Sequence, residues 1–136
     1  MEVTTNIKGQ LAVSKAELRA FELGFLPSRP LYDSRYDLII DMHGKLIRVQ
    51  VKYANGRPSH ARGSVVVKLD YENRKRKFYT YKKTEVDALI VYVPQVDKLC
   101  WLPQKKFIGK RKIHIRLVKP KSGQSKNITF ARDYYW

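Results

Sequence analysis

YDLIIDMHGKLIRVQVK, residues 36–52, is the stretch that decides the fold. Read with a period of two residues, it predicts a β-hairpin with its turn at His43-Gly44-Lys45. The second strand would place three polar side chains on one face: Arg48, Gln50 and Lys52. The valines between them would point the other way, into a core. An aspartate at the start of the first strand can then meet an amide oxygen and a lysine, which predicts a divalent-metal site beside a cation.

The rest of the chain indicates one helix followed by strands. A helix is expected over residues 10–23, because Leu11, Leu18 and Phe21 recur at helical spacing and Gly24 is a natural C-terminal stop. Strands are expected from near Leu31 and over residues 64–71, 87–93, 99–102 and 112–118, with a short aromatic segment at 78–81. Residues 87–93 are the most apolar run, which is typical of a central, doubly buried strand. The pattern predicts a single α+β domain, residues 1–136, with a mixed central β-sheet and a flanking helix.

The charge of the chain points to an acidic partner. Lysine and arginine outnumber aspartate and glutamate 28 to 12, which gives a formal net charge of +16. Such an excess destabilises the compact state through self-repulsion, so it usually has a use, and nucleic acid is the leading one. A membrane surface is a distant second, and the plain alternative is a basic protein without a specific partner. Apolar content of 43% argues for a folded protein.

Several other classes of protein are disfavoured by the sequence. Cys100 is the only cysteine, so no internal disulfide and no cysteine-rich zinc site is possible. The three histidines lack metal-ligand spacing: His43, His60 and His114. No apolar run approaches the roughly 20 residues that span a bilayer, and the N-terminus has no signal pattern. We expect a soluble, intracellular and cytoplasmic protein without a membrane association.

The candidate site suits phosphodiester hydrolysis. That reaction needs a metal that stabilises charge on the phosphate, an activated water, and a cation near the attacking or leaving oxygen. Mg²⁺ prefers oxygen ligands and keeps several waters, so one or two protein oxygens can suffice. Asp37 would supply the charged oxygen, Gln50 a neutral amide oxygen and Lys52 the cation. Arg48 on the same strand face could contact phosphate.

These residues resemble a known family. Asp37, a hairpin and then Gln50-Val51-Lys52 look like the PD-(D/E)XK nuclease motif, with Tyr36 in place of proline and Gln50 in place of the usual acid. Within that superfamily the chain is most similar to group I intron-encoded homing endonucleases, which carry glutamine at this third motif position. The similarity extends through the segments 8–12, 86–94, 101–103 and 131–134. It implies a restriction-endonuclease-like core and Mg²⁺-dependent double-strand cleavage of a long DNA site by a homodimer or homotetramer.

The first helix departs from the family pattern. The family places a glutamate there that helps to hold metal, whereas the candidate positions in this chain are Gln10 and Val13. Gln10 is isosteric with glutamate and is the better candidate, and Glu17 lies one turn beyond Val13 and is a poorer one. A site with one carboxylate and two amides should bind metal more weakly, which would affect catalysis more than DNA binding.

Each candidate also has a plainer interpretation. Asp37 and Asp41 could be solvated strand-end acids, and Gln50 and Lys52 an ordinary outer strand face. Glu17 and Glu22 are expected on a solvated helix face. The basic runs within residues 74–77 and 105–112 could be solvated turns, but two such runs in a small domain favour phosphate contact. The candidate DNA-binding residues are Arg48, Arg57, His60, Arg62, Lys68, Arg74, Lys75, Arg76, Lys110, Arg111, Lys112, His114 and Arg116. The aromatic residues Phe78, Tyr79 and Tyr81 either stack on bases or belong to a core or subunit interface.

The sequence therefore predicts a homing-type, sequence-specific endonuclease for double-stranded DNA. Asp37 and Gln50 would hold Mg²⁺ or another hard divalent cation, Lys52 would stabilise or position the nucleophile, and Gln10 would stand at an incomplete corner. Two alternatives remain open. A Holliday-junction resolvase on the same core would cut four-way junctions without strong sequence preference. A non-catalytic basic nucleic-acid-binding protein would bind without metal dependence and would be insensitive to changes at Lys52.

Overall fold

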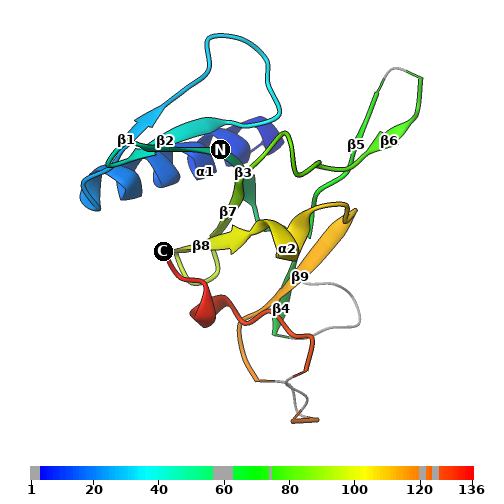
Figure 1. Ribbon diagram of the computed structural model, residues 1–136. Coiled ribbons are helices and arrows are strands. Elements are labelled where there is room, and N and C mark those ends of the chain that lie inside the picture. The colour runs from blue at the N-terminus through cyan, green and yellow to red at the C-terminus, as the bar shows by residue number, and fades with distance from the viewer. Residues whose placement is uncertain (1–3, 57–62, 74, 120–121, 124–125) are drawn as a thin grey trace.

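The computed structural model of the protein describes residues 4–56, 63–73, 75–119, 122–123 and 126–136. Five strands form the central sheet: β1 (Leu26–Ser28), β2 (Leu38–Met42), β3 (Lys45–Tyr53), β7 (Ala88–Val93) and β8 (Lys98–Pro103). They lie in the order β1-β2-β3-β7-β8 (Figure 1). Neighbours pair antiparallel except β3 and β7, which are parallel. The predicted α+β class with a mixed central sheet and a flanking helix is confirmed.

The hairpin of residues 36–52 forms as predicted. The two turn residues between β2 and β3, His43 and Gly44, have φ values of 55° and 97°. Positive φ at both central residues is the geometry of a tight hairpin turn whose twist matches that of the strands. Asp41 stabilises the turn, because its Oδ1 accepts a hydrogen bond from the Gly44 amide at 2.6 Å. Val49 and Val51 are buried, as the period of two requires.

Helix α1 (Thr5–Glu22) starts earlier than predicted. Thr4 caps it, because the Thr4 Oγ1 accepts from the Ile7 amide at 3.3 Å, and this cap was not recognised in the sequence. The large apolar residues Leu18 and Phe21 are exposed, and the buried face is a row of alanines: Ala12, Ala16 and Ala20. Small side chains let the helix lie close against the sheet, so the helical period was right and the buried face was not the expected one.

The opposite face of the sheet is covered by the ribbon β4 (Ser64–Lys68) with β9 (Lys112–Arg116), the short helix α2 (Gln104–Phe107) and the 3₁₀ turn Ala131–Asp133. The hairpin β5 (Tyr71–Glu72) with β6 (Phe78–Tyr79) projects away from the sheet (Figure 1). The expected strand near Leu31 is absent from the described residues there; the strand lies at Leu26–Ser28 instead, and a loop follows. The expected 64–71 strand breaks after Lys68, and α2 was not predicted.

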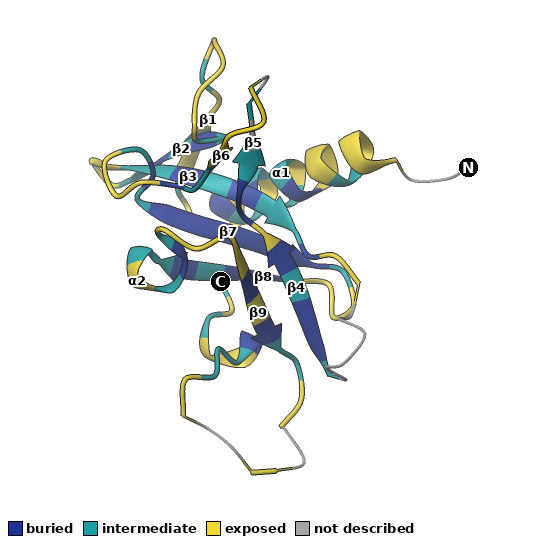
Figure 2. Cartoon of the chain, turned by 90° about the vertical axis from the view of Figure 1, so that its right-hand side faces the viewer, coloured by how far each residue is buried: buried dark blue, intermediate teal, exposed yellow. Residues whose placement is uncertain are grey.

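Strand β7 lies between two hydrophobic cores. One core lies under α1 and includes Ala88 and Ile90; the other lies under β4, β9 and α2 and includes Leu89 and Val91. All six residues of β7 are buried, as expected for the most apolar run, and Figure 2 shows this strand dark blue along its length. No helix in the described part of the chain is long and apolar enough to cross a membrane.

Candidate active site

Asp37 lies immediately before β2 and is fixed by the neighbouring strand. Its amide donates to the Val49 carbonyl at 2.9 Å, and its Oδ2 accepts from the Val51 amide at 2.9 Å. Burial raises the pKa of this carboxyl, an effect that the Val51 hydrogen bond and the charges of Lys52 and Arg29 only partly offset. A carboxylate held by a backbone amide and disfavoured by burial can gain from binding a cation.

Gln50 and Lys52 extend from β3 into the same cleft as Asp37. The cleft holds about 660 Å³ and is lined by the start of α1, the end of β3 and the segment 68–71. Burial lowers the pKa of the Lys52 ammonium, while Asp37 opposes that shift. Its Nζ lies 5.5 Å from the centre of the Tyr81 ring, so the aromatic face supports the charge. The structure thus brings together the three residues that the hairpin predicted.

Gln10 lines this cleft, and a guanidinium lies beside it. With the amide oxygen turned toward Arg29, that oxygen accepts from Nη1 at 2.9 Å and from Nη2 at 2.7 Å. Arg29 also forms an ion pair with Glu17, in which Nε donates to Oε2 at 3.1 Å. Glu17 is therefore a paired residue and not the solvated helix-face residue that we expected. The Arg29 guanidinium therefore lies beside Gln10 at the edge of the cleft, where the sequence predicted only the Gln10 amide.

Sequence reasoning missed an acid at the site. Asp70 lines the cleft with its side chain only 6% exposed, and its Oδ2 accepts from Arg111 Nε at 2.9 Å. Its charge acts on Lys52 from the segment that follows β4. Lys68, predicted as a DNA-contact residue, lines the same cleft. The alternation of Lys68 and Asp70 in SVVVKLDY was the available signal, because residues two apart on a strand share a face.

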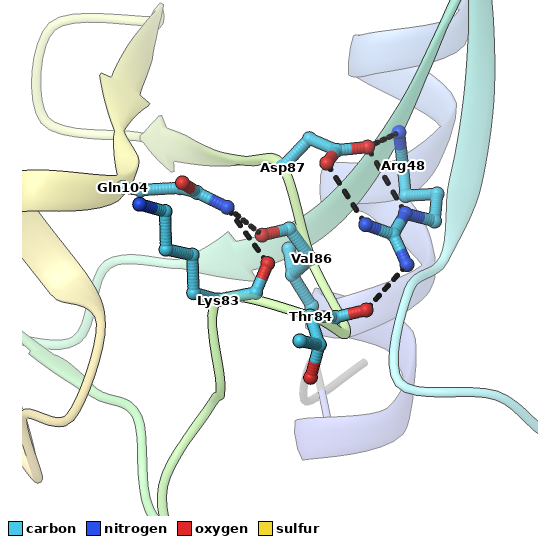
Figure 3. A network of polar contacts seen from close by, with 6 residues as sticks. All are labelled: Arg48, Lys83, Thr84, Val86, Asp87 and Gln104. Atoms are coloured by element: carbon cyan, nitrogen blue, oxygen red, sulfur yellow. Dashed lines mark hydrogen bonds and ion pairs between the residues drawn. The ribbon is translucent and has the colours of Figure 1, made fainter.

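Arg48, predicted to contact phosphate, is engaged elsewhere. Its Nε and Nη2 donate to the two oxygens of Asp87 at 3.0 and 2.9 Å, and its Nη1 donates to the Thr84 carbonyl at 2.6 Å (Figure 3). Gln104 braces the same turn by donating to the carbonyls of Lys83 and Val86, both at 2.9 Å (Figure 3). This cluster does not line the cleft, and it ties the β3 strand to the start of β7.

The other predicted DNA-contact residues fall into three groups. Several are exposed on the β5–β6 turn or around the start of β9: Lys75, Arg76, Lys110, Lys112 and His114. Arg111 is tied to Asp70 and lies over the Phe78 ring at 4.5 Å, while Arg116 Nε donates to the Val118 carbonyl at 3.1 Å. The remaining candidates lie outside the described residues: Arg57, His60, Arg62 and Arg74.

The donors at the site fit a hard cation with few protein ligands. Within the described ranges no cluster of three or more His, Cys, Asp or Glu residues occurs. Asp37 and Gln50 both line the cleft, and Gln50 Nε2 donates weakly to the Val51 carbonyl at 3.4 Å. A carboxylate and an amide oxygen are the ligand types that Mg²⁺ accepts while it keeps several waters.

The fold and this arrangement match a nuclease family. The family model described as PD-(D/E)XK endonuclease matches residues 3–136, and the chain belongs to that family. A search of curated proteins gives no match. Nucleases of this family generally use divalent metal ions, and a nuclease of this kind acts on DNA.

Two solved structures are similar to the chain. The bacterial homing endonuclease I-Ssp6803I is 25% identical with a TM-score of 0.73, over 98% of this chain and 88% of that one. MepB is 15% identical with a TM-score of 0.50, over 90% of this chain and 95% of that one, and this likeness concerns the fold alone. The restriction-endonuclease-like core that the family resemblance implied is confirmed.

Proposed function

We propose that the protein is a homing-type endonuclease that cleaves double-stranded DNA at a specific sequence in a Mg²⁺-dependent reaction. The observation that carries the proposal is the convergence of Asp37, Gln50 and the half-buried Lys52 on one cleft of a PD-(D/E)XK nuclease. The similarity to a bacterial homing endonuclease supports the homing type. The net charge of +16 suits a polyanionic substrate inside the cell, where we place the protein in the cytoplasm.

The roles of the residues follow from their environments. Asp37 and Gln50 would hold Mg²⁺, which supplies charge stabilisation at the phosphate and an activated water. Lys52 contributes a fixed cation in a partly desolvated site, where its field on a phosphate oxygen is stronger than in water. Tyr81 limits the positions of the ammonium, because its ring lies under Nζ. Arg29 holds Gln10 and leaves it as a neutral group at the edge of the site.

The target would be read by more than one copy of the chain. A domain of 136 residues cannot cover a long DNA site alone, so we propose a homodimer or homotetramer whose symmetry matches the DNA. Exposed cations on the β5–β6 turn and around β9 would contact phosphates, and each such contact should contribute to the salt dependence of binding.

Cleavage of a randomised duplex library in the presence of Mg²⁺ tests the proposal. We expect cuts at one recurrent sequence by the wild type or by Gln10→Glu, and none by Lys52→Ala. The Gln10→Glu variant restores a carboxylate, although Arg29 would compete for it, so Gln10→Glu/Arg29→Gln is the matched second variant. Absence of cuts from all of these proteins would overturn the nuclease proposal. Preferential cutting of four-way junctions, without a sequence preference, would instead favour a resolvase.

A further inference from the structure

The loop between β1 and β2 projects from the sheet (Figure 1). It carries two adjacent large hydrophobic residues, Leu31 and Tyr32, which we call the tip. Leu31 is 105% exposed and Tyr32 is 88% exposed, the highest values among the large hydrophobic side chains in the described residues. Single exposed apolar residues are common on protein surfaces, but two adjacent ones at the end of a projecting loop contribute nothing to the core. Two such exposed side chains are well placed to contact another molecule.

Arginine contacts anchor the loop on both sides of this tip. On one side, Arg29 pairs with Glu17 of α1 and donates to Gln10. On the other side, Arg35 Nε lies 3.2 Å from Glu85 Oε2, and its guanidinium lies 4.1 Å from the centre of the Tyr71 ring. A segment held at both ends has less entropy to lose when its tip becomes ordered against a partner. The anchors therefore present Leu31 and Tyr32 in a defined place.

That place adjoins the candidate active site. The loop residues from Arg29 to Ser34, together with Tyr36, line a hollow that also includes Asp37, and Asp37 is shared with the main cleft. A DNA strand with a phosphate at Asp37 would therefore run past this loop on one side. Arg29 and Arg35 flank the tip, but each is paired with a glutamate, so they position the loop and the attraction for DNA comes from the net charge of the whole chain.

We propose that Leu31 and Tyr32 form a wedge that enters the minor groove of DNA beside the phosphate to be cleaved and unstacks a base step there. The inference deepens the proposed function and rests on it for the identity of the substrate. Apolar side chains inserted from the minor groove kink the duplex, which brings more of the DNA surface against the protein. Arg29 and Arg35 keep the wedge in register with Asp37.

Binding without cleavage tests the wedge. In EDTA, we expect the double variant Leu31→Ala/Tyr32→Ala to bind a mixed-sequence duplex roughly tenfold more weakly than the wild type, because one stacking contact is lost. The slope of log Kd against log salt should not change, since neither residue neutralises a phosphate. Both side chains are exposed, so the variant should fold normally. The control is Leu46→Ala, which removes a 64% exposed leucine opposite Asp41, at the far end of β2 from Asp37.

Two further measurements identify the binding mode. A duplex carrying 2-aminopurine at several steps should become more fluorescent with the wild type than with Leu31→Ala/Tyr32→Ala, because a kinked step unstacks the base. A small-molecule minor-groove ligand such as distamycin should compete more strongly with the wild type than with this variant. Unchanged affinity in the double variant, an equal loss in Leu46→Ala, or no wild-type binding would overturn the wedge.

The outcomes separate this inference from the proposed function. Kinking in EDTA by a protein that cuts nothing with Mg²⁺ would support the wedge and count against the nuclease. Sequence-specific cleavage with Mg²⁺, together with equal DNA affinity and equal 2-aminopurine fluorescence in the wild type and in Leu31→Ala/Tyr32→Ala, would support the nuclease and overturn the wedge. A change in sedimentation mass caused by Leu31→Ala/Tyr32→Ala, without a change in DNA affinity, would assign the tip to contact between copies of the chain and overturn the wedge.

Discussion

Strand β3 carries two cations, Arg48 and Lys52, and the pKa of the carboxylate near each one shifts in the opposite direction. At Arg48, the guanidinium and Asp87 share several hydrogen bonds in an accessible place, and these bonds lower the pKa of the Asp87 carboxyl. At Lys52, four residues further along, burial lowers the pKa of the ammonium and raises the pKa of the nearby Asp37 carboxyl. The fold therefore stabilises the charged forms of Arg48 and Asp87, whereas burial disfavours the charged forms of Lys52 and Asp37.

The difference separates a structural ion pair from a functional one. Each charge of the Arg48–Asp87 pair finds donors or acceptors within the fold, so nothing is left for a ligand. Asp37 and Lys52 lose solvation without full compensation, which is how active sites hold groups ready for a substrate charge. A metal ion would supply the opposite charge that the Asp37 carboxylate lacks, and a phosphate would supply the one that the Lys52 ammonium lacks.

The largest expected effect is a difference in cleavage rate between variants of Lys52 and of Arg48. Lys52→Met should reduce the single-turnover cleavage rate by about a thousandfold, because it removes a charge at the reacting phosphate. Arg48→Met should leave that rate within about a factor of three, because its guanidinium serves Asp87. The assay uses the duplex selected from the library. Equal losses in the two variants would show that the distinction between the pairs is wrong.

The pH dependence of cleavage should be narrower than ordinary side-chain pKa values imply. At Mg²⁺ concentrations below saturation the rate reports the metal-free protein, in which Asp37 must be ionised before it can take up the metal, so its raised pKa moves the rising limb to higher pH. Lys52 must be protonated, and its lowered pKa moves the falling limb to lower pH. Single-turnover rates across pH at constant ionic strength give both limbs. Asp87→Asn is the control that should leave both limbs in place, and limbs at the values of free aspartate and lysine would refute the assigned burial.

The smallest effect should be on stability, with opposite signs at the two pairs. A carboxyl whose pKa is raised on folding loses stability as pH rises through the interval between its unfolded and folded pKa, so the charged Asp37 costs stability at neutral pH. Asp37→Asn should therefore stabilise the protein by about 1 kcal/mol, as is common when an active-site charge is removed. Urea unfolding at pH 7 measures the change.

Asp87→Asn is the matched variant of the other pair, and we expect it to lower the stability of the protein. Its carboxyl has a lowered pKa, so its stabilisation is present above the unfolded pKa and is lost as pH falls through the folded one. The variant should cost about 0.5 kcal/mol at pH 7, because the pair is accessible, and nothing in strong acid. Stabilisation by both asparagine variants, or by neither, would contradict the comparison.

Local patterns were enough for the parts of the fold with a strong period. The hairpin of residues 36–52 and the buried run at 88–93 were predictable, since alternation and continuous apolarity fix which faces are buried. The helix start was missed because a single threonine cap defines it, and Leu18 and Phe21 suggested the wrong buried face. The alanine face is buried because α1 lies close to the sheet, and the distance between a helix and a sheet cannot be read from the sequence of the helix alone.

The sequence by itself determined the chemical inventory: Asp37, Gln50 and Lys52 at fixed spacing on a hairpin, in a chain of strongly positive charge. Only the tertiary structure decided which charges are satisfied. It paired Arg48 with Asp87, brought Asp70 to the cleft, and set Arg29 against Gln10. These partners are distant in sequence, and a long-range contact depends on how the whole chain packs, so no local pattern records it.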